Sequence, residues 1–79
     1  MNENVLKIIN DWNPAEIYPL LYKEYEIEVD IILYLIKSSK SKLELSKQIY
    51  NLFEHYFGTE FHKSQGECEM IAEMLIEIK

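Results

Sequence analysis

The chain between Lys23 and Leu33 fits both a strand pattern and a helix pattern. Polar and apolar residues alternate strictly from Glu24 to Ile31, as in a half-buried strand. The alternation ends in the apolar residues that follow, and no turn residue separates the two parts. A helix accounts for all of residues 22–37, because glutamate favours helices and a sixteen-residue strand would be unusually long. The apolar positions at helical spacing are Tyr22, Tyr25, Val29, Ile32, Leu33 and Ile36.

Further apolar residues of this predicted helix lie outside that face. They are Ile27, Ile31, Tyr34 and Leu35. A helix that is apolar around much of its circumference lies centrally or has a second buried face. Either the other helices surround it, or part of its surface forms the seam of a homodimer. Surrounding it is the simpler way to build one core.

The first predicted helix covers residues 2–12. Its apolar face consists of Val5, Leu6, Ile9 and Trp12. The helix ends at Asn13-Pro14, because the residue before a proline avoids the helical conformation. The indole of Trp12 then either closes one end of the core or forms an exposed anchor for a partner. Residues 14–19 have proline at both ends and predict a short turn that carries Ile17 and Tyr18 inward.

The third predicted helix covers residues 42–57. Ser41 and Glu44 form Ser-x-x-Glu, the pattern of a capping box, and Gly58 is a natural C-cap. The apolar face of this helix is Leu45, Ile49, Leu52, Phe53 and Tyr56. In the loop that follows, we expect Phe61 to fill one end of the core.

The last predicted helix covers residues 65–78 and follows a second capping box, formed by Ser64 and Glu67. Its apolar face is Cys68, Ile71, Ala72, Leu75 and Ile78. Caps and apolar faces agree with each other, and together they predict an all-α fold. We expect residues 1–79 to form a single domain, a small four-helix bundle with a short proline-bounded turn between helices 1 and 2.

The composition predicts a soluble cytoplasmic protein. Of the 79 residues, 48% are hydrophobic, so a folded core is expected rather than disorder. The single cysteine, Cys68, excludes an intrachain disulfide, the usual staple of a small secreted domain. The start of the chain has no signal-peptide pattern, and the longest apolar run has only six residues. We therefore expect no contact with a membrane.

The net charge of −6 narrows the choice of partner. Nucleic acids bind basic surfaces, so an acidic chain argues against a nucleic-acid ligand. The charge fits another protein with a basic surface, and it equally fits plain solubility.

Four motifs occur along the chain in a familiar order. They are IINDWNP (8–14), EYEIEV (24–29), ELSKQIYNLFEHYFG (44–58) and KSQGECEMIAEML (63–75). Together they resemble the YugE-like family, a domain of unknown function in small bacterial proteins, mainly of Firmicutes. This resemblance implies a small all-helical protein and brings no established activity. Asn13 stands where the family typically has the aspartate of Trp-Asp-Pro. Glu26 stands where the family typically has the aspartate of a Glu-Tyr-Asp-like patch. The Trp-x-Pro and Glu-Tyr segments also have a looser likeness to small bacterial immunity proteins.

Histidine and cysteine are scarce, and the plentiful carboxylates are scattered over helices, where such residues are usually solvated surface. His55 and His62 are the only histidines, and Cys68 falls on an apolar helix face, where cysteine is usually an inert core residue. A zinc site built from these three would have unusual spacings. Gly58 and Gly66 are isolated, so no phosphate-binding loop is present. We expect no catalytic residues, no metal and no cofactor, and hence no enzymatic activity.

Two groups of residues form the candidate partner-binding surface. The first lies near the start of the second helix: Tyr18, Tyr22, Glu24, Tyr25, Glu26 and Glu28. Tyrosine combines rigid area with a polar tip and is common at interfaces, although such tyrosines also line core edges. The second group is Glu69, Glu73 and Glu77, spaced four residues apart on the last helix. This row is either a solvated face or an acidic stripe for a basic partner.

These features predict a non-catalytic, acidic protein-binding module. In a concrete form, it is an immunity or inhibitor protein that covers a basic effector such as a nuclease toxin. One alternative is a structural or regulatory homodimer that uses the spare apolar face of the second helix. Another is a small-molecule or metal binder that uses His55, His62 and Cys68. The sequence leaves the choice between a monomer and a homodimer open.

Overall fold

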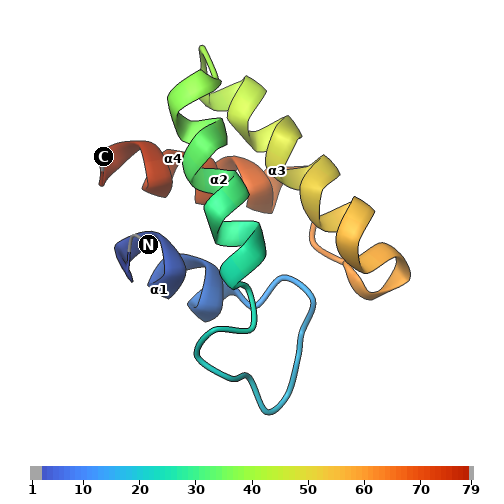
Figure 1. The fold of residues 1–79 in the computed structure, drawn as a ribbon. Helices are drawn as coiled ribbons and strands as arrows, with labels where there is room; N and C mark the ends of the chain where they lie inside the picture. Colours follow the sequence, from blue (N-terminus) through green and yellow to red (C-terminus); the bar gives the residue numbers. More distant parts are fainter. Residues whose placement is uncertain (1–2, 79) are drawn as a thin grey trace.

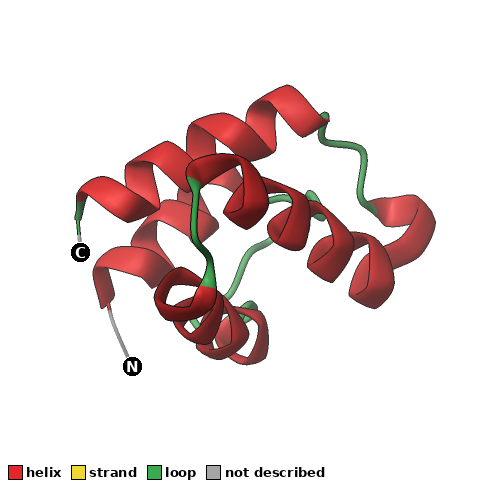
Figure 2. Cartoon of the chain, turned by 90° about the horizontal axis from the view of Figure 1, so that it is seen from above, coloured by secondary structure: helices red, strands yellow, loops and turns green. Residues whose placement is uncertain are grey.

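A computed structural model describes residues 3–78 and shows a small bundle of helices (Figure 1). The helices are α1 (Glu3–Trp12), α2 (Glu26–Ser38), α3 (Lys42–Phe57) and α4 (Gln65–Glu77). A short 3-10 helix, η1 (Gly58–Glu60), follows α3. Residues 3–78 contain no strand (Figure 2), so the prediction of an all-α four-helix bundle is confirmed.

The helices α2 and α4 lie on opposite sides of the core. Helix α3 packs against both of them, and so does α1; the pair α3–α4 has the most extensive contact. Figure 1 accordingly shows α4 passing behind α2. Other helices therefore cover α2 on only part of its circumference. Ile27 is 65% exposed and Tyr34 is 69% exposed, so the expectation that the bundle surrounds α2 is wrong on that side.

The inner face of α2 forms part of the core, as predicted. Val29 and Ile32 are fully buried, and Ile36 is 9% exposed. They meet the inner faces of the other helices, whose buried residues include Leu6, Ile9, Leu45, Ile49, Phe53, Cys68, Ile71 and Leu75. Burying a side chain of this size contributes about 1.5–3 kcal/mol, so this shared core is what holds the helices together.

Aromatic rings close the core where α1, α3 and the loop before α4 meet. Phe53, on α3, is fully buried. The ring of Trp12 contacts it edge-on, with 5.7 Å between centroids, and Phe61 stacks on it at 5.8 Å. Phe61 thus fills one end of the core, as predicted, and Trp12 closes that end rather than forming an exposed anchor.

The start of α2 differs from the prediction. The helix begins at Glu26 rather than at residue 22, and residues 22–25 form a turn instead. Two backbone hydrogen bonds shape this turn, from Glu24 N–H to the Leu21 carbonyl and from Glu26 N–H to the Lys23 carbonyl. The reason lies in Tyr25, which occupies the N-cap position and is fully buried.

The hydroxyl of Tyr25 is bound at the end of α1. It donates to Oδ1 of Asn13 at 2.5 Å and accepts from the backbone N–H of Ala15 at 3.0 Å. Burial raises the pKa of Tyr25, so the hydroxyl keeps its proton and remains a donor. Asn13 has a φ of 48°, in the left-handed region that asparagine tolerates better than most residues.

The side chain of Asn13 also holds the loop that follows. Its Oδ1 accepts from the Ile17 N–H at 3.0 Å, and its Nδ2 donates to the Ile17 carbonyl at 3.0 Å. An aspartate in this place would lack the N–H donor. Asn13, Ala15, Ile17 and Tyr25 form what we call the Asn13 clamp. This clamp requires the side-chain amide of asparagine, which both donates and accepts hydrogen bonds. Tyr18, next to the clamp, points outward and is 79% exposed, so its predicted inward orientation is wrong.

The second half of the chain follows the prediction closely. Helix α3 has the expected bounds, and Gly58 is its C-cap with a φ of 54°. Ser64 and Glu67 form a complete capping box at α4. At α3, Ser41 accepts from the Glu44 N–H, but the Glu44 carboxylate accepts from the Lys40 N–H, one residue before the predicted donor.

Two apolar residues expected in the core lie at its margin instead. Tyr56 is 48% exposed and Ile78 is 38% exposed. Both follow the helical spacing of their neighbours, but Tyr56 lies in the last turn of α3 and Ile78 is the C-cap residue of α4, and helix ends are often frayed.

We predict that Tyr25→Phe destabilises the fold by about 1–3 kcal/mol, because it leaves the buried N–H of Ala15 without an acceptor. In thermal unfolding, the midpoint should fall by roughly 4–8 °C per kcal/mol for a domain of this size. Tyr22→Phe is the matched control, since that hydroxyl is exposed and its loss should cost at most about 0.5 kcal/mol. Equal stability of the two variants would contradict the clamp.

Candidate functional site

An exposed loop with apolar side chains connects α1 to α2. This tyrosine loop (residues 17–24) extends beyond the helices at the bottom of Figure 1. Tyr18 is 79% exposed, Leu21 66% and Tyr22 58%. Single exposed apolar residues are ordinary, but a group of large ones on one short loop is typical of a contact surface.

The base of the tyrosine loop is held in place. The Asn13 clamp fixes its first residue, and Asn10 Nδ2 donates to the Tyr22 carbonyl at 2.9 Å near its other end. Just before the loop, Glu16 forms an ion pair with Lys63 at 3.4 Å, which links this region to the segment before α4. The tip is therefore presented on a fixed base, which lowers the entropy lost on binding.

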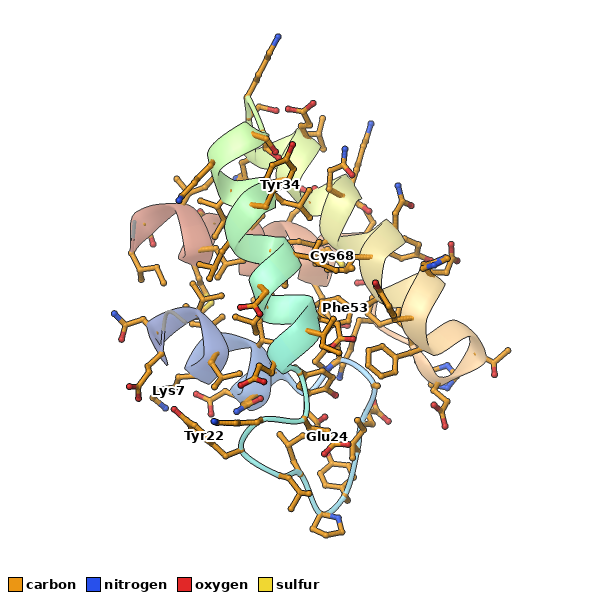
Figure 3. All side chains as sticks on the ribbon, in the orientation of Figure 1. Lys7, Tyr22, Glu24, Tyr34, Phe53 and Cys68 are labelled. Atoms are coloured by element: carbon orange, nitrogen blue, oxygen red, sulfur yellow. The ribbon has the colours of Figure 1, made fainter. Side chains whose placement is uncertain are left out.

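Charged groups surround the loop. The hydroxyl of Tyr22 donates to the Glu3 carboxylate at 3.0 Å, and this hydrogen bond raises the pKa of Tyr22. Figure 3 shows Tyr22 close to Lys7 on α1, with Glu24 at the base of α2. Lys7 forms an ion pair with Asp11 at 3.0 Å. Tyr22 and these α1 residues line an open depression of about 410 Å³.

The structure keeps some of the predicted tyrosine and glutamate residues on this surface and removes others. Tyr18, Tyr22 and Glu24 are exposed on the loop. Glu26 is partly buried and lies 3.8 Å from Lys23. Tyr25 is fully buried in the Asn13 clamp, and Glu28 is only 7% exposed in the first turn of α2. Neither Tyr25 nor Glu28 can form part of an open contact surface.

The predicted acidic row lies on another side of the molecule. Glu73 and Glu77 are exposed on α4, and Glu69 is partly exposed. Because α4 faces α2 across the core, this row does not join the tyrosine loop at the start of α2. The single surface expected from the sequence is therefore two separate surfaces.

Sequence reasoning missed three residues of these surfaces. Leu21 lies in the segment IYPLLY, between the predicted turn (residues 14–19) and the predicted start of the second helix at residue 22. Met70 and Met74, on α4, are 67% and 43% exposed. The sequence did indicate that both methionines are exposed, because neither falls on the α4 face that carries Cys68 and Leu75.

The only cysteine is a core residue, as predicted. Cys68 has no exposed surface, and burial raises its pKa to about 11. At neutral pH it is therefore a thiol and not the nucleophilic thiolate. His55 and His62 are exposed. Within residues 3–78, no three histidine, cysteine, aspartate or glutamate side chains lie together in a way that could hold a metal ion.

We predict that the Cys68 thiol makes stability depend on pH above pH 9. The folded-state pKa of about 11 exceeds the ordinary value of 9.0, so its contribution is complete below pH 9 and is lost as the pH rises toward 11. The loss should be about 2 kcal/mol, measured by denaturant unfolding at several pH values. Cys68→Ala should show a shallower decline over the same range. Identical declines would contradict a buried thiol.

No helix within residues 3–78 combines the length and apolar character needed to cross a membrane.

Comparison with known proteins shows the family of the chain. Neither a curated protein nor a solved structure matches the chain. The model of a protein family described as a domain of unknown function, DUF1871, matches residues 4–79. The chain therefore belongs to the DUF1871 family.

Proposed function

We propose that the protein is a non-catalytic module that binds another protein through the tyrosine loop. The observation that carries this proposal is the exposure of Tyr18, Leu21 and Tyr22 on a loop whose base is fixed. Large apolar side chains presented in this way serve as anchors in protein interfaces. Because the clamp already orders the loop, binding would cost little additional conformational entropy.

The charge of the protein favours a partner with a basic surface. The chain has a net charge of −6, and Glu24 is exposed on the loop itself. Opposite charges on a partner would speed the encounter and set its orientation, while the apolar tip would supply most of the affinity. The buried, protonated Cys68 supports a non-catalytic role.

A concrete form of this proposal is an immunity or inhibitor protein of the cytoplasm that covers a basic effector. The support comes from the acidic charge and from the Trp-x-Pro and Glu-Tyr segments, which have a loose likeness to bacterial immunity proteins. The same motifs support a place among the YugE-like proteins within the DUF1871 family.

We predict that the double variant Tyr18→Ser/Leu21→Ser loses the partner while the fold remains intact. Both side chains are exposed, so the thermal midpoint should change little. The measurement is affinity capture from a lysate of the source cell at low salt, followed by identification of the captured protein. Binding should also weaken steeply at 0.5 M salt, where charges are screened over about 4 Å.

The matched control is Leu43→Ser, which removes an apolar side chain that is 50% exposed on α3. This variant should capture the same basic protein as the unaltered chain. Failure to recover any partner at low salt, or equal capture by the loop variant, would overturn the proposal.

A second candidate function is a homodimer formed through the outer face of α2. The exposure of Ile27 (65%) and Tyr34 (69%) favours it, since both lie on the side that the bundle leaves uncovered. Sedimentation at micromolar concentration should then show a dimer that Tyr34→Asp converts to a monomer. A monomer before any substitution excludes this function.

A further inference from the structure

We propose that the outer face of α4 is a second docking surface, which binds a basic amphipathic helix of a partner protein. This α4 outer face consists of Glu69, Met70, Glu73, Met74 and Glu77. It is separate from the tyrosine loop, because α4 lies across the core from α2. The inference can therefore hold whether or not the tyrosine loop binds a partner.

Apolar side chains form one row of this face. Met70 is 67% exposed and Met74 is 43% exposed. They are four residues apart, so they lie one above the other along about 6 Å of helix. Met70 and Met74 line a shallow open groove of about 270 Å³ together with Glu73 and Glu77. Flexible, polarisable methionine side chains adapt to the shape of an apolar partner.

Glutamates form the adjacent row and specify the charge of the partner. Helix α4 contains no lysine or arginine, and Glu69, Glu73 and Glu77 have no ion-pair partner among the described residues. Like charges four residues apart repel each other, and Glu77 in the last turn also opposes the helix dipole. A row of lysines or arginines on a partner would remove both unfavourable terms.

The spacing of the two rows fits a helix better than an extended chain. An apolar row beside a charged row, both with a period of four residues, is the complement of an amphipathic helix with the same two rows. A partner helix would place its apolar residues against Met70 and Met74 and its basic residues against Glu73 and Glu77. A strand offers no such matching period, because its side chains alternate every two residues.

The test uses a designed helical peptide of leucine and lysine, with leucines on one face and lysines beside them. Its affinity for the purified full-length protein is measured by fluorescence anisotropy. The 13C-labelled methyl groups of the methionines report the site by NMR. We expect the methyl signals of Met70 and Met74 to shift, and we expect Glu73→Lys/Glu77→Lys to weaken binding at least about tenfold. That variant should also unfold at a higher temperature, since it places a lysine four residues after Glu69 and a positive charge in the last turn of the helix.

Two controls separate this surface from the tyrosine loop and from general attraction between charges. Tyr18→Ser/Leu21→Ser should bind the peptide unchanged. A scrambled peptide of the same composition should bind at least about tenfold more weakly, because it lacks the apolar row. Equal binding of the scrambled peptide, or unshifted methionine signals, would overturn the proposal. So would a dimer of the free protein that Met70→Ser/Met74→Ser dissociates, since the face would then bind a second copy of the chain.

Discussion

The hydroxyl of Tyr25 is the polar group on which the arrangement of the first half of the chain depends. A buried hydroxyl is costly unless it is hydrogen-bonded, and this one has two partners, Asn13 and Ala15, at the end of α1. To reach them, the chain must return from the loop with Tyr25 pointing into the core. Helix α2 can then begin only after that residue, and the residues before it remain as a loop at the surface.

The aromatic core connects this arrangement to the rest of the bundle. The ring of Tyr25 contacts Phe53 edge-on at 6.1 Å, and Phe53 also contacts Trp12 and Phe61. One phenylalanine of α3 therefore joins the end of α1, the start of α2 and the segment before α4. Such edge-on and stacked pairs add about 0.5–1.5 kcal/mol each beyond burial of area. The packing explains how a short chain can keep an apolar loop exposed without losing the fold.

The two exposed surfaces have different physical character. The tyrosine loop presents apolar and aromatic tips on a base fixed by hydrogen bonds, and its neighbouring charges are partly paired. The outer face of α4 has a shallow apolar groove beside carboxylates that have no ion-pair partner among the described residues. Exposed apolar side chains and neighbouring like charges each lower the stability of an isolated domain slightly. A bound partner would cover the apolar side chains and neutralise the charges. Their separation across the core would let the small protein contact two partners at once.

The sequence alone determined the features that depend on neighbours along the chain. The bounds of α3, the capping box at Ser64 and the core position of Cys68 follow from caps and helical spacing within one segment. The start of α2, the hydrogen bonds of the Tyr25 hydroxyl and the outward orientation of Tyr18 could not be predicted in this way. They depend on hydrogen bonds between residues ten or more positions apart, such as Tyr25 and Asn13, which periodicity does not encode. Which apolar residues stay exposed was likewise decided by tertiary structure, because a helical face is buried only where another element covers it.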